Sequence, residues 1–285
     1  MIKNIFLIIL LKIYFLTFFM KIKENKTNLS YEFFENENKD SDVILILHGW
    51  QGASSSWTEV GKKLSEKWYH VIIPDLPCAS KLSNCNDIYN LDDFAEIIEK
   101  FIDDLKTKYP EINFDNLILW GHSNWWAISI KLANRKNIKI LRLILNNSAW
   151  IRNDKKRSFK RKILKLVTSF LAPFLKGDGS RRLKKLRELF YKAIWSHDYL
   201  KAEKNPNLKQ TYLNMISSDL KDEIKNIDNH TLLIRWEKDN YTPVSDAHFM
   251  RNNIKNSKLI ILDNETHWIH LKNPDRLVET FLQNI

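Results

Sequence analysis

Short, continuous apolar runs alternate along this chain with segments of helical periodicity, and this alternation restricts the possible folds more than any other feature. Continuous runs of this length suit strands that are buried on both faces of a parallel sheet. The segment 91–109 places Phe94, Ile98 and Phe101 on one stripe, as an amphipathic helix does. The alternation of apolar runs with helical segments predicts a mostly parallel, doubly wound α/β sheet. The six predicted strands occupy residues 43–49, 70–76, 116–122, 140–148, 231–239 and 258–264.

The alternation stops near residue 151 and resumes near residue 231, so an insertion interrupts the sheet. We interpret residues 151–225 as a helical cap, and residues 21–150 and 226–285 as the α/β core. A core of this size needs no disulfide staples. The two cysteines, Cys78 and Cys85, cannot by themselves build a disulfide framework or a four-ligand zinc site. We therefore expect neither a metal nor a cofactor.

The net charge of +11 is concentrated in the insertion. Between Arg152 and Lys192 there are 15 Lys or Arg and 3 acidic residues, so the rest of the chain is close to neutral. Such a patch suits nucleic acid, anionic lipid or an acidic ligand, or it is only a solvated helical face. The stretch KILKLVTSFLAPFL has an apolar face opposite a lysine-rich side, and interleaved aromatic residues for base stacking are lacking. This pattern favours an anionic membrane surface over nucleic acid. The basic residues expected on the outside of the cap are Arg157, Lys160, Arg161, Arg181, Arg182 and Lys185.

A hydrophobic segment occupies residues 1–20, with an apolar run over 4–20 that is broken only by Lys12. The run is marginal for crossing a membrane, and it lacks the small residues of a cleavage site. We interpret it either as an anchor or as the result of a mis-assigned start ahead of Met20, with a cleavable signal as the third option. Depending on this choice, the protein is predicted to be cytoplasmic or membrane-associated.

A strand-to-helix junction near the middle of the chain reads Gly121-His122-Ser123-Asn124. A glycine two residues before a serine at such a turn is the first half of a nucleophile elbow, in which a strained backbone exposes the hydroxyl. Serine is a weak nucleophile without a base. The alternative for a lone serine here is a helix cap.

Asp239 and His267 each follow a predicted strand, at the edge where open α/β sheets place their sites. We predict that Ser123 is the nucleophile, His267 the general base, and Asp239 the residue that orients the imidazole. The alternative for a lone aspartate after a strand is an ordinary turn residue. The order and strand-end placement of all three residues favour the catalytic interpretation.

An oxyanion intermediate needs two preorganised donors. We predict the backbone N–H of Asn124 as one donor. The other is the N–H of Trp50, in the turn after the first predicted core strand. Gly49 belongs to the same turn. His48 and His122 are predicted to be structural and bonded to nearby backbone.

The stretches LILHGWQGASSSW, VIIPDLP, WGHSNWWA, RWEKDNYTPV and THWIHLKNPDRLVETF resemble the α/β-hydrolase superfamily, over roughly residues 29–285. The resemblance implies the fold, the triad roles and a helical cap over the pocket. In that family the base is the first histidine of the last stretch, which favours His267 over His270. An aspartate nucleophile is absent from the elbow, which points to acyl chemistry.

We therefore predict a serine hydrolase of the carboxylesterase or lipase type, acting on a small hydrophobic acyl ester. An aminopeptidase and a carbon–carbon bond hydrolase remain alternatives within the fold. The alternative from another class is a non-catalytic protein whose basic insertion binds a membrane or nucleic acid.

The chain has only 6 glycines but 10 tryptophans. Seven tryptophans stand where family members commonly carry glycine, and in the elbow an indole two residues after Ser123 is expected to crowd or distort the turn. We interpret these seven as glycines, encoded by UGA codons that the source organism reads as glycine. A decayed, inactive hydrolase is the alternative. The seven positions are Trp50, Trp68, Trp125, Trp126, Trp150, Trp195 and Trp236.

Overall fold

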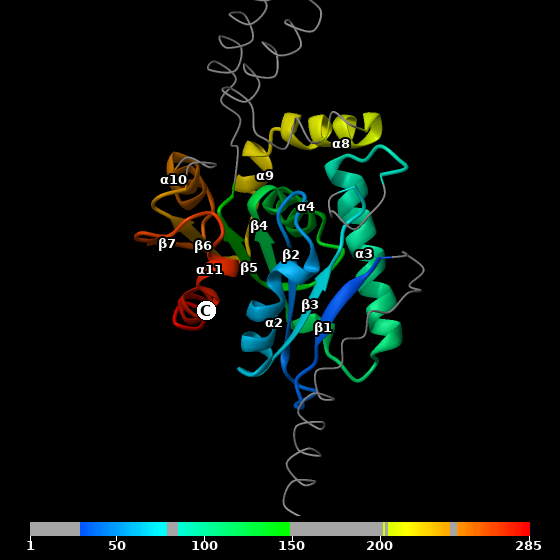
Figure 1. The fold of residues 1–285 in the computed structure, drawn as a ribbon, viewed down its shortest axis with the longest axis vertical. Coiled ribbons are helices and arrows are strands. Elements are labelled where there is room, and N and C mark those ends of the chain that lie inside the picture. Colours follow the sequence, from blue (N-terminus) through cyan, green and yellow to red (C-terminus); the bar gives the residue numbers. More distant parts are fainter. Residues whose placement is uncertain (1–28, 79–84, 149–201, 203–204, 240–243) are drawn as a thin grey trace, which may run out of the picture.

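The computed structural model describes residues 29–78, 85–148, 202, 205–239 and 244–285, which form a single sheet with helices on both faces (Figure 1). The sheet has seven strands in the order β1-β3-β2-β4-β5-β6-β7. Only β1 pairs antiparallel with its neighbour β3, and the other neighbours are parallel. The strands are β1 (Tyr31–Phe34), β2 (Asp42–Leu47), β3 (Tyr69–Pro74), β4 (Leu117–His122), β5 (Ile140–Asn146), β6 (His230–Trp236) and β7 (Ser257–Leu262).

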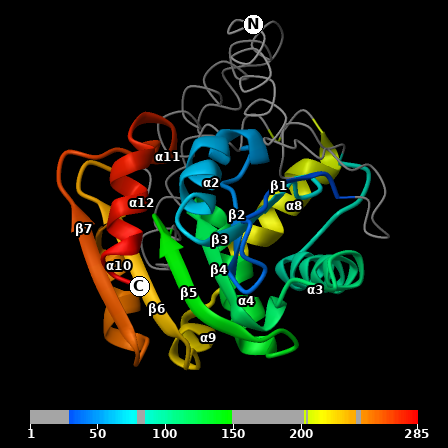
Figure 2. The same cartoon turned by 90° about the horizontal axis from the view of Figure 1, so that it is seen from below.

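Two helical layers enclose this sheet (Figure 2). One core, around Leu45 and Leu145, lies between the sheet and the layer that contains α3 and α4. The other, around Ile44 and Ile144, lies on the side of α2 and α12. The helices are α2 (Thr58–Ser65), α3 (Leu91–Lys108), α4 (Trp126–Arg135), α8 (Pro206–Ser217), α9 (Lys221–Lys225), α10 (Val244–Asn253), α11 (Ile269–Lys272) and α12 (Pro274–Leu282), with short 3-10 turns η1 (Ser54–Trp57), η2 (Phe114–Asn116) and η3 (Ser123–Trp125).

The predicted fold class is confirmed, and all six predicted core strands are present within a few residues of their expected bounds. Neighbouring residues of β2 face opposite layers, which is why the strand is apolar from Val43 to Leu47. The register aligns Leu47 of β2 with Gly121 of β4, and His122 with Asn146 of β5. The strands therefore end together, and the segments that follow them share one edge of the sheet.

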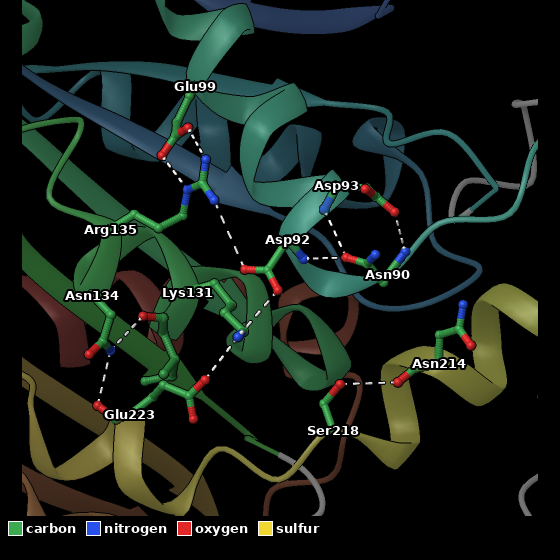
Figure 3. A network of polar contacts seen from close by, with 11 residues as sticks. Asn90, Asp92, Asp93, Glu99, Lys131, Asn134, Arg135, Asn214, Ser218 and Glu223 are labelled. Atoms are coloured by element: carbon green, nitrogen blue, oxygen red, sulfur yellow. Dashed lines mark hydrogen bonds and ion pairs between the residues drawn. The ribbon is translucent and has the colours of Figure 1, made fainter.

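Polar contacts fix the position of α4, whose N-terminus follows Ser123 (Figure 3). Nε and Nη2 of Arg135 each donate to the carboxylate of Glu99 on α3, at 2.8 Å. Lys131 of α4 pairs with Glu223 of α9 at 2.8 Å. Helix α3 itself begins at a capping box between Asn90 and its Asp93. These contacts fasten α4 to its two neighbours in the same layer.

Of the predicted cap, residues 151–225, the structure describes little beyond α8 and α9. Helix α8 lies beside the segment that enters α3, where Thr211 accepts a hydrogen bond from the Tyr89 N–H at 3.0 Å (Figure 1). Residues 149–201, with the six basic residues expected on the outside, lie outside the described residues, as does the hydrophobic segment 1–20. In the part of the chain that the structure describes, no helix is both long and apolar enough to cross a membrane.

Two local features were not predicted from the sequence. Cys78 and Cys85, seven residues apart in the connection between β3 and α3, form one disulfide. Trp236, one of the seven tryptophans interpreted as glycines, is the last residue of β6 and is buried. The N–H of the next residue, Glu237, donates to the carbonyl oxygen of Leu262 at 3.0 Å, so β6 ends near this point, three residues before the predicted end at 239.

Candidate active site

A strained turn joins β4 to α4 and carries Ser123 at its tip. Ser123 has φ 54°, in the left-handed region that only a few residue types adopt without cost. Gly121 permits the turn, because a Cβ there would lie 2.4 Å from the hydroxyl oxygen of Ser129 and 2.9 Å from the Cα of Trp126. The close approach of helix to strand therefore requires glycine at 121.

Three side chains meet at this turn, each from the C-terminal end of a different strand. Nε2 of His267 lies 3.0 Å from the Ser123 hydroxyl oxygen, and its Nδ1 lies 2.8 Å from Oδ2 of Asp239. Ser123 follows β4, Asp239 follows β6 and His267 follows β7. His270 does not take the place of His267, since its ring stacks on Trp57 at 4.6 Å between centroids. The structure thus brings the three predicted residues together.

The hydrogen-bonded series of Ser123, His267 and Asp239 is largely shielded from solvent. The side chain of Asp239 is 0% exposed and that of His267 is 8% exposed. Hydrogen bonds to an ionised group are stronger in such surroundings than in water. An imidazole that receives a proton here has a carboxylate beside it, which stabilises the imidazolium and fixes the ring orientation.

The predicted oxyanion donors belong to two turns that touch. A Cβ on Gly49 would lie 3.3 Å from the Ser123 Cβ, so the turn that carries Trp50 packs against the elbow. Among the described residues, neither the Trp50 N–H nor the Asn124 N–H is taken up by a hydrogen bond to a neighbouring element. Both donors therefore remain available for a ligand beside Ser123.

Buried histidine rings pack beside the imidazole of His267. His122 lies 5.1 Å from the His267 ring and 4.9 Å from the His270 ring, between centroids. Burial lowers the pKa of His122 well below its usual range, and nearby His270 lowers it further. Burial, with repulsion from His267, also lowers the pKa of His270 to about 3. His48, whose pKa burial also lowers, has its Nδ1 2.8 Å from the carbonyl oxygen of Gly49. Burial thus disfavours the charged form of each of these three rings.

Two polar residues were not predicted from the sequence. Asn147, after β5, has φ 48° and its Nδ2 lies 3.4 Å from Nδ1 of His267. Asp75, after β3, accepts hydrogen bonds from the Ser54 N–H at 2.8 Å and its hydroxyl at 3.0 Å. Both follow strands in the structure, but the predicted strands 70–76 and 140–148 contain them, so they were not predicted as strand-end residues. An Asn or Asp after a strand is also common in ordinary turns.

The tryptophans beside the elbow pack without displacing it. Trp125 has φ −80°, so no positive φ is needed at this position. Its ring lies 5.5 Å from the Trp50 ring and 5.1 Å from Phe94, and Trp50 lies 5.2 Å from Tyr212 of α8. The indole N–H groups of Trp50 and Trp125 are buried without hydrogen-bond partners, which is unfavourable. The elbow is therefore intact, and the two indoles occupy the space next to it.

Within the described ranges, no group of three or more His, Cys, Asp or Glu side chains is arranged to hold a metal ion.

Comparisons with known proteins identify the family of this chain. The family described as "alpha/beta hydrolase fold" matches residues 42–274. The pimeloyl-[acyl-carrier protein] methyl ester esterase of Nitrosospira multiformis is 20% identical over 258 residues, which cover 84% of this chain and 93% of the relative. The protein of that name from Nitrosomonas europaea is 23% identical over 252 residues, again 84% and 93% of the two chains. Among solved structures, a bacterial membrane phospholipase A has a TM-score of 0.66 at 19% identity, with 99% of this chain and 90% of that chain covered.

Proposed function

Because the chain belongs to the alpha/beta hydrolase fold family, we propose that it is a serine hydrolase that cleaves an ester of a small hydrophobic acyl group. One observation carries the proposal: His267 bridges the Ser123 hydroxyl at 3.0 Å and the Asp239 carboxylate at 2.8 Å. A serine, a base and a group that orients the base are the parts that acyl transfer requires.

The reaction proceeds through an acyl-enzyme. The Ser123 oxygen attacks the ester carbonyl carbon while Nε2 of His267 takes the hydroxyl proton. The N–H groups of Trp50 and Asn124 stabilise the negative charge on the carbonyl oxygen. The imidazolium then protonates the leaving alcohol. A water molecule, deprotonated by His267, releases the acid in the second half of the reaction.

The names of two relatives favour ester substrates over amides. Both relatives are named methyl ester esterases, although they are only 20% and 23% identical to this chain. The serine of the elbow attacks both esters and amides and does not distinguish between them. Methyl and p-nitrophenyl esters of short fatty acids are therefore the first substrates to try.

The test is hydrolysis of p-nitrophenyl butyrate by the purified chain. Ser123→Ala is expected to lower kcat by several orders of magnitude with little change in circular dichroism. Ser65→Ala, which removes a hydroxyl that only caps the end of α2, is the matched control and is expected to keep full activity. An aminoacyl p-nitroanilide and a vinylogous diketone test the aminopeptidase and carbon–carbon hydrolase alternatives. Turnover of either in preference to all esters, or equal ester turnover by Ser123→Ala, contradicts the proposal.

A further inference from the structure

Arg235 is a buried cation that the reaction described above does not use. It lies in β6, four residues before Asp239, and is 1% exposed. Its Nη1 donates to the carbonyl oxygen of Ser148 at 3.5 Å, whereas Nε and Nη2 are buried without a hydrogen-bond partner. Burying a charge is costly unless it is paired and hydrogen-bonded. The Nε and Nη2 edge of Arg235 therefore lacks the hydrogen-bond acceptors that a buried cation needs.

Another arginine of the same chain shows what this edge binds. Arg135 uses the same two nitrogens, Nε and Nη2, to hold both oxygens of Glu99 at 2.8 Å (Figure 3). These two donors point in parallel and match the two oxygens of one carboxylate. In Arg235 that edge is unfilled, and no ion pair joins it to a carboxylate among the described residues.

The guanidinium contacts the same turn that contacts the catalytic imidazole. Arg235 donates to Ser148, and the preceding residue, Asn147, lies 3.4 Å from Nδ1 of His267. The Ser148 hydroxyl and Oδ1 of Asn147 are also buried without a partner. Two contacts, Arg235 to Ser148 and Asn147 to His267, thus connect these residues to the triad. Asp239 and Asp246 oppose the effect of burial on the pKa of Arg235, but burial dominates and lowers it.

We propose that the edge formed by Nε and Nη2 of Arg235 binds a carboxylate that the substrate carries in addition to its ester. The substrate class is then the half-ester of a dicarboxylic acid, with the ester at Ser123 and the free acid at Arg235. The methylene chain between the two is the hydrophobic part of the acyl group, and the free acid is added to the proposed function by this inference. The inference rests on the proposed function, because it assigns specificity to the same site. Ser148 would supply a further hydrogen bond from its hydroxyl.

The experiment compares mono-p-nitrophenyl esters of succinic, glutaric and adipic acid with neutral p-nitrophenyl esters of matched length. The preference is the ratio of kcat/KM for the acidic ester to that for the neutral ester. Loss of a charged hydrogen-bond pair is expected to lower the preference by about 10- to 100-fold in Arg235→Gln. Arg235→Lys keeps the charge but loses the paired donors, so an intermediate ratio is expected. Arg135→Gln breaks the other bidentate pair away from the site and is expected to leave the ratio unchanged.

A binding measurement keeps the inference separate from catalysis. Glutarate is expected to raise the melting temperature of Ser123→Ala but not that of the Ser123→Ala/Arg235→Gln double variant. The inference is overturned if Arg235→Gln lowers kcat/KM equally for both ester types. It is also overturned if the wild type shows no preference and glutarate has no effect on the melting temperature. Either result assigns Arg235 a structural role. If glutarate binds through Arg235 while no ester is hydrolysed, the proposed function fails and the carboxylate site stands.

Discussion

Nε2 of His267 lies 3.0 Å from the hydroxyl oxygen of Ser123, although 144 positions separate the two residues in sequence. Parallel strands bring them together, because β4 and β7 end at the same edge of the sheet and each residue follows its strand. The contact therefore depends on the correct pairing of the strands between β4 and β7. Asp239 extends it to a chain of three groups.

Asp239→Asn tests the third group. The amide cannot stabilise an imidazolium, and it favours the tautomer of His267 with the wrong nitrogen protonated. We expect kcat for p-nitrophenyl butyrate to fall by about 10³- to 10⁴-fold, with KM nearly unchanged. Asp263→Asn, an exposed carboxylate after β7, is the matched control and is expected to keep full activity. Activity within tenfold of the original in Asp239→Asn would show that Asp239 does not orient the base.

Acid is expected to destabilise the fold through the buried histidines. The pKa of His270 is lowered to about 3 from 6.5, and that of His122 is lowered well below 6.5. Between pH 6.5 and these lowered pKa values, the unfolded chain binds protons that the folded chain does not. The free energy of unfolding is therefore highest above pH 6.5 and decreases as the pH falls below it. Each such histidine changes the folding equilibrium by about tenfold per pH unit. Urea unfolding across this window measures the slope.

His270→Gln provides the test of this assignment. The slope of the unfolding free energy against pH reports the number of protons taken up on unfolding, and in this variant that number is expected to fall by about one. His230→Gln, at an exposed position, is the matched control and is expected to keep the original slope. An unchanged slope in His270→Gln would mean that this ring is not held neutral by the fold.

Trp68 tests the interpretation of the excess tryptophans. It is 70% exposed and has φ 76°, a conformation that glycine adopts without strain. Trp68→Gly is expected to raise the free energy of unfolding by about 1 kcal/mol, because relief of backbone strain outweighs the small loss of packing. Trp120→Gly is the contrasting control, since Trp120 is buried and donates to Asn146 at 2.8 Å, and it should destabilise the chain. Peptides from the source organism should carry glycine at 68 and 125, and tryptophan there would exclude recoding.

The basic insertion between Arg152 and Lys192 is proposed to face an anionic membrane. Each basic residue near such a surface contributes roughly 1 kcal/mol, and salt screens the attraction. We expect the chain to sediment with phosphatidylserine vesicles at low salt and to dissociate as salt is added. Vesicles of neutral lipid are the control. Absence of binding at low salt, or binding that salt does not weaken, would contradict the proposal.

The arrangement of the sheet was predictable from sequence, because strands buried on both faces are apolar at every position, as in Ile44 and Leu45. The same reasoning placed Asp239 and His267 after strands. Arg235 was not predictable, since only the packed structure shows that its Nε and Nη2 lack partners. The disulfide between Cys78 and Cys85 depends on how the single connection between β3 and α3 folds back on itself, and sequence alone does not determine the distance between the two cysteines.

Trp236 shows a second kind of limit. The predicted strand extends to residue 239, and family likeness interprets Trp236 as a glycine position. In the structure the pairing with β7 continues to Trp236, which aligns with Leu262, and the indole packs in the core on the side of α2 and α12. Tertiary packing decided the boundary of this strand, and boundaries of this kind are the least predictable part of a sequence analysis.

Covalent labelling with a fluorophosphonate tests most directly whether Ser123 and His267 form a working nucleophile and base. The reagent phosphonylates a serine only where a base activates it, and peptide mass spectrometry identifies the modified residue. We predict a single stoichiometric adduct on Ser123, absent in Ser123→Ala and strongly slowed in His267→Gln. An unlabelled protein that is folded by circular dichroism, or an adduct on another serine, would contradict the account.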